Sequence, residues 1–512
     1  MSRPPGHYYP ADVDSNAPAP TESELPEQMR IRRQKRAALL ESGIEAYPVE
    51  VPRSHTLRQI REAYPDLPPD TTTGDVVDVV GRVIFLRNTG KLCFATLREG
   101  DGTELQAMLS LANVGADELA RWKSMVDIGD FVAVHGEVIT SRRGELSVLA
   151  DRWTMAAKAL RPLPTAHNEL SEENRTRQRY VDLIVRPAAR DMVRARSAVV
   201  RTLRRVLDSK SYIEIETPIL QLLHGGAAAR PFVTHANALG QDLYLRIALE
   251  LFLKRAVVGG IERVYEINRV FRNEGIDSTH SPEFTMLEAY QAYATYDTMA
   301  ELTRELVQES ARAVFGSTQV EHADGSVHEL GGEWRSVTFF QALSEVVGKE
   351  VGPDTSVVDL KALAAAHDVA LKPDWGADEI ALELFEKLVE HTLVEPTFVR
   401  DYPIGVRPLS RRHRDDPRLA EAWDLFIFGA EVATAYSELV DPVDQRERLE
   451  AQSLRAAAGD PDAMQLDEDF LRALEYGMPP TGGMGMGVDR LLMTLTGVGI
   501  RETILYPLVR SE

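Results

Sequence analysis

The stretch FRNEGIDSTHSPEFTMLEAY, residues 271–290, decides how the larger part of this chain is interpreted. Two runs with apolar residues flank a polar loop, which predicts two β-strands joined through His280. Period-two alternation places Arg272 and Glu274 on one face of the first strand. On the returning strand, the residues that share a face are Phe284, Met286, Glu288 and Tyr290.

The hairpin offers two groups that suit a nucleotide. A guanidinium such as that of Arg272 can hold a phosphate or carboxylate, and a ring such as that of Phe284 can stack on a planar base. The alternative is a surface hairpin that carries an ion pair. The chain has no G-x-x-x-x-G-K-[ST] and no G-x-G-x-x-G after a strand, so side chains on a sheet would have to build the site.

The hairpin lies within residues 190–512, where predicted helices alternate with strands but not in the regular βαβ rhythm of a parallel sheet. Helices are predicted at 192–207 and 378–392. The pattern predicts an α+β domain built on a mostly antiparallel sheet. Its predicted strands are IEIETPIL at 213–220, RVYEINRVFR at 263–272, FTMLEAYQAYA at 284–294, DLFIFG at 424–429 and VATAYSEL at 432–439.

Residues 29–160 carry a different pattern. A helical stretch near 116–126 separates the third and fourth of five short β-like segments. Five strands with one intervening helix predict a small Greek-key barrel of the OB type, preceded by a basic helix at 26–42. The five segments are 76–87, 91–100, 103–110, 130–140 and 144–153.

Two segments lack such patterns. Residues 1–28 are rich in Pro and in small or acidic residues and have no apolar stretch typical of a signal peptide, so a disordered tail is predicted. Residues 161–189 are polar and contain Pro162, Pro164 and Pro187, which predicts a linker between the two domains.

Composition narrows the class of protein. Of 512 residues, 44% are hydrophobic and 27% charged, as in an ordinary globular protein, and no apolar run approaches the roughly 18 residues that would span a bilayer. Cys93 is the only cysteine, which excludes an intrachain disulfide and favours the cytoplasm. The net charge of −21 argues against non-specific coating of nucleic acid. A local basic face, or else a solvated helix face, is predicted for Arg30, Arg32, Arg33, Lys35 and Arg36.

Three separated motifs resemble those of class II aminoacyl-tRNA synthetases. FRNEG…H…EFTMLE is similar to motif 2 in its lysine-specific form, and GGMGMGVDRLLMTLTG at 482–497 is similar to motif 3. Residues 197–207 followed by YIEIETPIL resemble motif 1, which forms much of the homodimer interface in this family. Segments 225–255, 396–403 and 436–446 also look lysine-specific, so the resemblance to lysyl-tRNA synthetases covers nearly the whole chain after the tail.

This resemblance implies ATP, L-lysine and tRNA(Lys) as substrates and Mg²⁺ as the metal. Arg272 would contact the α-phosphate and the reacting carboxylate, and Glu274 would contact the adenine amino group. Phe284 would stack on adenine, while His280 and Arg490 would lie near the β- and γ-phosphates. Arg272 and Arg490 are the implied catalytic residues.

Two carboxylates predict the metal site. Asp424 and Glu431 are seven residues apart, and a two-residue turn at Phe428-Gly429 would return both to one face of a hairpin. Mg²⁺ prefers hard oxygen ligands and takes one or two carboxylates beside phosphate oxygens. An isolated pair of this kind is usually structural, but within these motifs it is predicted to bind the metal. The family usually has Glu at the first position, so Asp424 is shorter by one methylene.

A lysine pocket needs acids, because a buried ε-ammonium group is costly unless it is paired and hydrogen-bonded. The resemblance implies Glu288 and Glu438 as its partners, and Glu250 as the partner of the α-amino group. Strict alternation from Glu431 would put Glu438 on the opposite face, so a β-bulge near Ala433 is predicted. Three more positions depart from the family: Thr434 replaces a common asparagine, Gly405 a frequent acid, and Ala248 the proline before Leu-Glu. The other implied lysine contacts are Gly226, Arg272, Tyr290, Tyr436 and the departing Thr434.

OB barrels bind single-stranded bases by aromatic stacking beside polar contacts. The resemblance implies Phe94 as the stacking residue, with Arg82, Gln106 and Glu145 around an anticodon base. Considered alone, Phe94 would be a core aromatic residue.

The implied reaction has two steps. The lysine carboxylate attacks the α-phosphorus of ATP to give lysyl-adenylate and pyrophosphate, and a terminal ribose hydroxyl of tRNA then attacks the adenylate and releases AMP. Two alternatives stay open. A synthetase of the same subclass for another amino acid, such as aspartate, would need a basic residue where the paired acids lie. A non-charging paralogue would bind RNA or a partner without aminoacylation.

Overall fold

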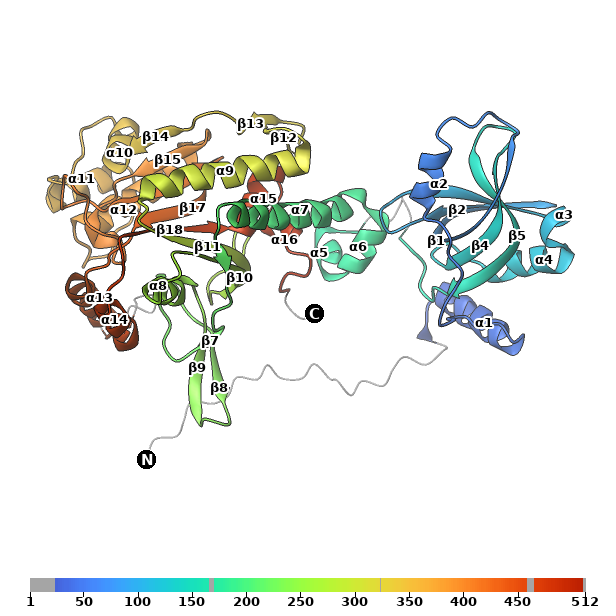
Figure 1. Cartoon of the computed structure of the whole chain (residues 1–512), viewed down its shortest axis with the longest axis horizontal. Coiled ribbons are helices and arrows are strands. Elements are labelled where there is room, and N and C mark those ends of the chain that lie inside the picture. The colour runs from blue at the N-terminus through green and yellow to red at the C-terminus, as the bar shows by residue number, and fades with distance from the viewer. Residues whose placement is uncertain (1–23, 165–169, 323, 458–464, 510–512) are drawn as a thin grey trace. The chain divides into compact units, whose positions relative to one another are not determined.

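A computed structural model describes residues 24–164, 170–322, 324–457 and 465–509. The chain divides into two compact units, Met1–Ser171 with Leu183–Pro187 and Glu172–Asp182 with Ala188–Glu512 (Figure 1). A disordered tail was predicted for residues 1–28, of which residues 1–23 lie outside the described residues. Among the described helices, none combines the length and apolarity needed to cross a bilayer.

The first unit contains a closed five-stranded barrel, as the sequence predicted, and its strand order is β1-β2-β3-β5-β4. Alternate residues of each strand point inward, so the barrel core includes Cys93, which is fully buried. A single helix was predicted between the third and fourth strands; two are present, α3 and α4. The elements are β1 Thr72–Thr89, β2 Leu92–Arg98, β3 Glu104–Ser110, α3 Leu111–Val114, α4 Ala116–Met125, β4 Phe131–Thr140 and β5 Leu146–Ala157.

The basic helix is present as α1 (Glu27–Glu41), and a short helix α2 (Leu57–Ala63) follows it. Two members of its basic cluster are not available to a ligand. Arg32 is buried and donates hydrogen bonds to the carbonyls of Ile128, at 2.8 Å, and Ala159, at 3.1 Å. Lys35 pairs with Asp127 at 2.6 Å. The prediction of a five-residue basic or solvated face is therefore wrong for these two, because they fix α1 to the barrel.

The second unit is built on an eight-stranded sheet with the order β14-β15-β16-β17-β18-β11-β10-β6. Only the β14–β15 and β10–β6 pairs are parallel, so the predicted α+β class with a mostly antiparallel sheet is confirmed. The strands are β6 Ile213–Glu214, β10 Arg263–Phe271, β11 Glu283–Ala292, β14 Arg335–Thr338, β15 Thr397–Arg400, β16 Ala422–Ile427, β17 Ala430–Ser437 and β18 Thr481–Gly487.

One face of this sheet packs against helices and the other is left for the site. Leu287, Ala435 and Met486 belong to a large core cluster on the helical side. Figure 1 shows α7 and α9 along the sheet. The intervening residues of the same strands, such as Glu288, point to the opposite face. The helices of this core are α7 Pro187–Ser209, α9 Tyr296–Phe315 and α15 Val488–Thr496.

The remaining elements surround the sheet. A small three-stranded sheet has the order β7-β9-β8, and β12 pairs with β13. The strands are β7 Leu220–Gln221, β8 Val233–Ala236, β9 Gln241–Leu245, β12 Gln319–Glu321 and β13 Val327–Glu329. The helices are α8 Glu250–Val258, α10 Phe339–Val347, α11 Val357–Ala366, α12 Ala377–Leu388, α13 Pro442–Ala457, α14 Glu468–Glu475 and α16 Ile500–Thr503.

The predicted linker, residues 161–189, contains two short helices, α5 (Glu172–Arg177) and α6 (Arg179–Val185). Arg179 is buried and explains this order. Its guanidinium pairs with Asp182 at 2.7 Å and donates to the carbonyl of Arg501 at 2.7 Å. The polar composition that suggested a linker therefore belongs, in part, to packed structure of the second unit.

Candidate active site

The hairpin that opened the sequence is formed by β10 and β11, in antiparallel register with Phe271 opposite Glu283. The first strand ends at Phe271, so Arg272 and Glu274 lie in the connecting loop. Their predicted placement by strand alternation is therefore wrong. Arg272 still continues the pairing for one residue, because its N–H donates to Pro282 O at 2.9 Å.

The loop is held by an aspartate that the sequence analysis did not select. Asp277 Oδ1 accepts hydrogen bonds from the backbone N–H groups of Thr279, at 2.7 Å, and His280, at 2.8 Å. These donors hold the pKa of Asp277 well below its usual range. Its imidazole neighbour, His280 Nδ1, lies 3.0 Å from Asp277 Oδ2. Asp277 thus orients His280, and the Asp-x-Thr turn pattern is the signal that could have found it.

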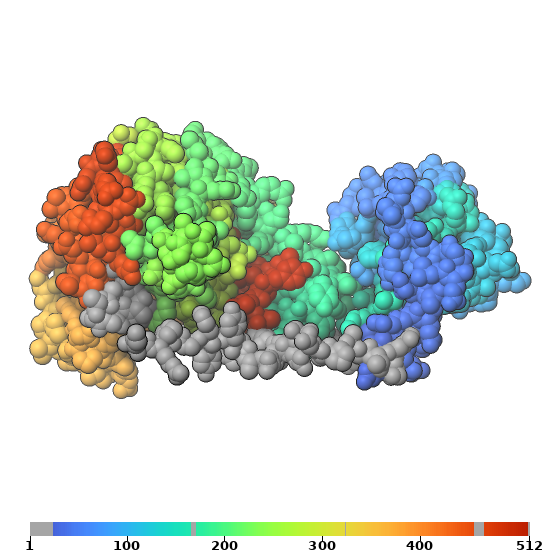
Figure 2. Space-filling view, turned by 90° about the horizontal axis from the view of Figure 1, so that it is seen from below, coloured from blue at the N-terminus to red at the C-terminus, as the bar shows by residue number. Residues whose placement is uncertain are grey.

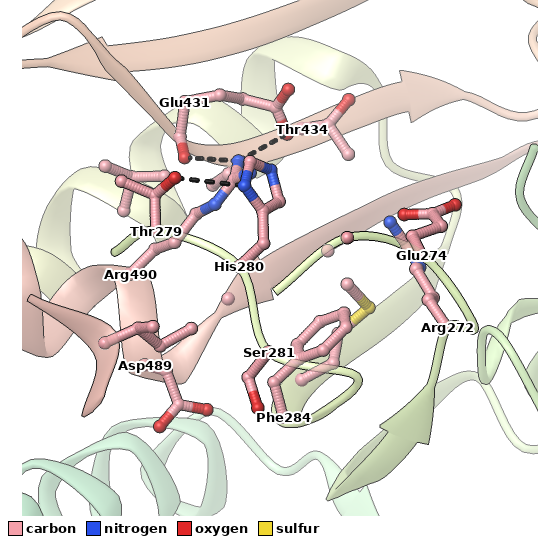
Figure 3. A pocket seen from close by; sticks show the side chains of 17 residues that line it. Arg272, Glu274, Thr279, His280, Ser281, Phe284, Glu431, Thr434, Asp489 and Arg490 are labelled. Atoms are coloured by element: carbon pink, nitrogen blue, oxygen red, sulfur yellow. Dashed lines mark hydrogen bonds and ion pairs between the residues drawn. The ribbon is translucent and has the colours of Figure 1, made fainter. Parts of the chain in front are cut away.

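A cavity of about 220 Å³ opens beside this loop. Arg272 lies beside the aromatic ring, with its guanidinium carbon 5.3 Å from the Phe284 centroid. Figure 3 shows these side chains around one space, with Arg490 and Glu431 opposite. Six of the seven predicted ATP contacts line the cavity, namely Arg272, Glu274, His280, Phe284, Glu431 and Arg490.

The glycine-rich strand β18 leaves room on the site face of the sheet. A side chain at Gly483 would overlap the carboxylate of Glu438 and the ring of Tyr290. After the strand, Asp489 begins α15 and accepts hydrogen bonds from Thr285 N–H at 2.7 Å and from Arg196 at 2.5 Å. This buried carboxylate fixes the start of α15.

Arg490, next to Asp489 on α15, is directed at the neighbouring hairpin. Its Nη1 donates to the Glu431 carbonyl at 2.9 Å and lies 3.8 Å from the Glu431 carboxylate. Arg272 and Arg490 therefore place two cations on one cavity.

The β16–β17 hairpin has the predicted two-residue turn. Phe428 and Gly429 both have positive φ, 55° and 74°, as a tight hairpin turn of this twist requires. Leu425 pairs with Ala433 while Phe426 pairs with Glu431, so Val432 is an extra residue. The predicted bulge is confirmed, one residue before Ala433.

The bulge brings Glu431, Thr434 and Tyr436 to the same cavity of about 200 Å³. Glu288 and Tyr290 reach it from β11, and Glu250 from the first turn of α8. Seven of the eight predicted lysine contacts line this cavity, namely Gly226, Glu250, Arg272, Glu288, Tyr290, Thr434 and Tyr436. The eighth, Glu438, is buried behind Gly483.

Glu288 is held from two sides. It accepts hydrogen bonds from Leu249 N–H and from the Tyr290 hydroxyl, each at 2.9 Å. Burial, reinforced by the charge of Glu250, nevertheless raises the pKa of Glu288 to about 7. Burial also raises the pKa of Glu438. A cationic ligand would stabilise the ionised form of both carboxylates.

A lysine that the sequence analysis missed lies among these acids. Lys254 is fully buried on α8, with Nζ 2.5 Å from Glu250 and 2.5 Å from Glu438. The four-residue spacing of Glu250 and Lys254 was a signal, but such helical pairs are usually exposed and carry little information.

Asp424 and Glu431 also face this cavity. Asp424 Oδ2 accepts a hydrogen bond from Arg407, whereas Oδ1 has no hydrogen-bond partner among the described residues. Burial, followed by the charge of Asp424, raises the pKa of Glu431. Two hard oxygen donors that repel each other fit a magnesium ion if phosphate oxygens complete its shell. Within the described part of the chain no group of three or more His, Cys, Asp or Glu residues forms a metal site by itself.

Two of the departures from the family, Gly405 and Thr434, make local contacts in the site. Gly405 N–H donates to Asp378 Oδ2 at 2.8 Å, and a Cβ at Gly405 would lie 2.5 Å from that oxygen. An acidic side chain there would have to displace the Asp378 carboxylate and would repel its charge. Thr434 Oγ1 lies 3.3 Å from the hydroxyl of Tyr436 and from the carbonyl of Trp423, to which it donates.

The two cavities adjoin, since both are lined by Arg272, Met286, Glu431, Thr434 and Gly485. Arg272 thus lies where a ligand in one cavity would meet a ligand in the other.

The barrel carries a separate groove of about 970 Å³. Phe94, Gln106 and Glu145 line it, and Phe94 is half-buried while its neighbours Cys93 and Ala95 fill the core. Phe94 is therefore not a core residue. Gln106 Nε2 donates to Ser147 Oγ at 2.8 Å.

Arg82 does not line this groove, contrary to the prediction. It donates to the Gly129 carbonyl at 2.9 Å, with its guanidinium 4.2 Å from the Phe131 ring centroid. Arg87 takes its place, since it pairs with Phe94 across β1 and β2 with its guanidinium 4.6 Å from that ring. Arg82 instead lies opposite Arg98, four positions from Phe94 along β2, and a bulge in β1 between Val83 and Phe85 separates it from Arg87.

Comparison with known proteins agrees with this geometry. Residues 171–510 match the family model "tRNA synthetases class II (D, K and N)", and residues 77–156 match "OB-fold nucleic acid binding domain". The lysine–tRNA ligase of Mycolicibacterium gilvum is 61% identical over 491 residues, 96% of this chain and 98% of the relative. The lysine–tRNA ligase of Mycobacterium bovis is 59% identical over 500 residues, which are 96% of this chain and 99% of the relative. The lysine–tRNA ligase of Kineococcus radiotolerans is 60% identical over 490 residues, which are 96% of this chain and 98% of the relative. The chain belongs to the lysine–tRNA ligases of the class II tRNA synthetase family.

Proposed function

We propose that this chain joins L-lysine to tRNA(Lys) at the expense of ATP, through a lysyl-adenylate. The observation that carries this proposal is the pair of adjoining cavities. One is lined by two arginines and an aromatic ring, and the other by Glu250 and Glu288, with Glu438 buried behind it. Anion-binding and cation-binding sites side by side suit a nucleoside triphosphate next to a diamino acid.

In the ATP cavity, Phe284 stacks on adenine and Glu274 accepts from its amino group. Arg272 holds the α-phosphate together with the lysine carboxylate, and His280 and Arg490 neutralise the outer phosphates. The location of Arg272 in both cavities supports its role at the reacting atoms. The acceleration of the reaction comes from positioning the substrates and from stabilising charge, and no side chain acts as a nucleophile.

In the lysine cavity, Glu288 and Glu438 pair with the ε-ammonium group, between Tyr290 and Tyr436. Glu250 pairs with the α-amino group, close to Gly226, and Thr434 contributes a hydroxyl. Fixed acids of this kind reject a neutral side chain, because one carboxylate would be left buried and unpaired.

Asp424 and Glu431 hold Mg²⁺ beside the triphosphate in this proposal. The unpartnered Oδ1 of Asp424 supports it. When bound, the metal would supply positive charge to the triphosphate. Arg407, which already pairs with Asp424, is a second source of positive charge at the same carboxylate.

Activation and transfer follow from this arrangement. The lysine carboxylate attacks the α-phosphorus in line and pyrophosphate leaves, with Arg272 stabilising the charge on the α-phosphate oxygens. The 3′-hydroxyl of the terminal tRNA ribose then attacks the carbonyl carbon of the adenylate, and AMP leaves. The barrel groove reads the anticodon with Phe94, Gln106 and Glu145, and with Arg87 in place of Arg82.

The protein acts as a homodimer through the region of motif 1, and in the cytoplasm, where its substrates occur together. Exposed apolar side chains near this motif support the dimer. They lie in or beside β6, β7 and β8, and the small sheet β7-β9-β8 projects from its unit in Figure 1 and appears in green in Figure 2. They are Ile213, Ile219, Leu220, Leu222, Leu223 and Val233.

Two alternatives are less well supported. A pocket for aspartate needs a free basic residue, but Arg407 is held by Asp424, and Arg272 is assigned to the reacting carboxylate. A non-charging paralogue is not favoured, since the described site retains the acids and arginines that the reaction needs.

The test is ATP–pyrophosphate exchange with purified protein across a panel of amino acids, followed by aminoacylation of tRNA(Lys). Lysine alone should support rapid exchange, and lysyl-tRNA should accumulate. Exchange with aspartate instead of lysine, or exchange without any charged tRNA, would contradict the proposal.

A further inference from the structure

A lysine of the protein itself lies within the acidic region proposed for the substrate. Lys254 is completely buried, and its two partners Glu250 and Glu438 are only 5% and 2% exposed. Nζ lies 2.5 Å from one oxygen of each. We propose that Lys254 is a positioning residue that sets the charge of this pocket, so that it accepts an amino acid with two ammonium groups. This inference rests on the proposed function, with lysine as the substrate.

The charges of the buried groups support this proposal. Three buried carboxylates, those of Glu250, Glu288 and Glu438, surround the pocket, and Lys254 supplies one positive charge. The other two acids of the cavity are matched separately, Asp424 by Arg407 and Glu431 by Arg490, so two negative charges are left unmatched. Lysine carries two ammonium groups, while its carboxylate is directed to Arg272, so the filled pocket is balanced. Without Lys254, three acids at close range could not all stay ionised, and one would take up a proton.

The contacts also show which acids Lys254 controls. Glu250 lies one turn before Lys254 on α8, and Glu438 follows β17 on the sheet, so the ammonium group joins the helix to the sheet. Glu438 Oε1 has no hydrogen-bond partner among the described residues. Lys254 therefore holds one oxygen of Glu438 and leaves the other for a ligand. Glu288 is oriented separately, by Leu249 and Tyr290.

Lys254 stays an ammonium group in this environment. Burial opposes its charged form, but the charges of Glu250 and Glu438 outweigh burial and raise its pKa above the usual value. The pocket thus contains a permanent cation rather than a group that titrates near neutral pH.

Two substitutions separate charge from packing. Lys254→Met removes the charge but keeps most of the side-chain volume, whereas Lys254→Ala also leaves a cavity. In ATP–pyrophosphate exchange, Lys254→Met should raise the KM for lysine by at least about tenfold, because Glu250 and Glu438 lose the cation that orients them and keeps them ionised. The change in kcat should stay below about threefold, and the KM for ATP should stay within about twofold.

The pH profile gives a readout that a merely structural lysine would not move. In the wild type the KM for lysine should level off once the two unmatched carboxylates are ionised. In Lys254→Met the plateau should move to higher pH by at least about one unit, since loss of the Lys254 charge makes Glu250 and Glu438 harder to ionise.

Chemical rescue tests the ammonium group directly. Propylammonium supplies the atoms that Lys254→Ala lacks, so it should lower the KM for lysine in that variant. It should have no such effect in Lys254→Met, where the space is filled. 1-Propanol, of equal size but neutral, is the matched control and should rescue neither variant.

The outcomes divide clearly. An unchanged lysine KM and pH profile in folded Lys254→Met would overturn the inference, and so would equal rescue by propanol and propylammonium, which would indicate packing alone. Absence of lysine-dependent exchange in the wild type would instead overturn the proposed function.

If neither variant melts cooperatively, calorimetry on the wild type decides. Norleucine and 6-aminohexanoate each lack one ammonium group and should bind with about one more proton taken up than lysine at pH 7. Equal proton uptake by all three ligands would show that the pocket does not carry two unmatched charges.

Discussion

At Glu288, burial and hydrogen bonding shift the pKa of one carboxylate in opposite directions. Donors from Leu249 and Tyr290 favour the ionised form, yet burial prevails and the pKa rises to about 7. The free enzyme therefore keeps this acid partly protonated at neutral pH. A ligand that brings an ammonium group relieves the cost of burial, so the same feature that is unfavourable in the empty pocket favours binding.

Removing the charge of Glu288 should weaken lysine specifically. We expect Glu288→Gln to cost about 2–4 kcal/mol of binding, roughly 30- to 1,000-fold in the KM for lysine, because an ammonium group loses a buried charged partner. The KM for ATP should change little. Tyr290→Phe is the matched control, since it removes one hydrogen bond worth about 1 kcal/mol. Equal effects of Glu288→Gln on both substrates in pyrophosphate exchange would contradict the assigned role.

Lysine affinity should rise with pH. Binding needs the ionised form of Glu288, whose pKa of about 7 lies above the ordinary value. Below pH 7 a proton must leave before lysine binds, so the Kd should increase about tenfold per pH unit toward pH 6 and level off above pH 8. Calorimetric titration without ATP measures this directly. A Kd that stays constant from pH 6 to 8 would rule out titration of this acid.

At the scale of elements, the sequence predicted most where the backbone is regular. The β10–β11 and β16–β17 hairpins, the five-stranded barrel and the bulge beside Ala433 all followed from alternation or from the family pattern. Alternation failed where a strand ends early, as at Arg272. The resemblance implied Arg82 at the anticodon groove, but Arg82 lies opposite Arg98 and outside the lining of that groove.

Contacts between distant elements were also beyond the sequence. Lys254 was missed because its partner Glu438 lies 184 positions away and only folding brings them together. A linker was predicted where Arg179 in fact anchors two short helices. In each case a charged side chain, usually a sign of exposure, is buried by paired groups that no local pattern reveals.

The β16–β17 turn should tolerate no side chain at its second position. Gly429 has φ 74°, and a Cβ there would lie 3.2 Å from the backbone of His391. We expect Gly429→Ala to lower the free energy of unfolding by about 1–3 kcal/mol. Gly352→Ala, where a Cβ meets nothing within 4 Å, is the matched control. Equal urea midpoints for both variants and the wild type would contradict this account of the turn.

At the scale of the whole molecule, the chain separates two tasks between units with separate cores. The overall charge of −21 does not describe the barrel groove, which four arginines and three carboxylates line. Local composition, rather than net charge, therefore bears on the RNA site proposed for this groove. The separation also means that a change in the groove need not affect the chemistry of amino-acid activation.

Phe94→Ala should weaken charging without altering activation. Loss of a stacked base costs about 1–3 kcal/mol, which is roughly 5- to 150-fold in the KM for tRNA. Pyrophosphate exchange should be unchanged, because it does not involve tRNA. Arg82→Ala, at a residue outside the groove, should leave the KM for tRNA near the wild-type value. A larger increase in the KM for tRNA in Arg82→Ala than in Phe94→Ala would contradict the placement of Arg82 outside the groove.

The buried position of Cys93 makes this protein convenient for spectroscopy. It is the only thiol in the sequence, it is completely enclosed by the barrel, and burial raises its pKa, so it offers little thiolate to an electrophile. A cysteine introduced at an exposed position, such as Asn88→Cys beside the groove, would be labelled almost alone by a maleimide dye. Fluorescence from that single reporter could follow the arrival of RNA in real time, with the native chain as an unlabelled blank.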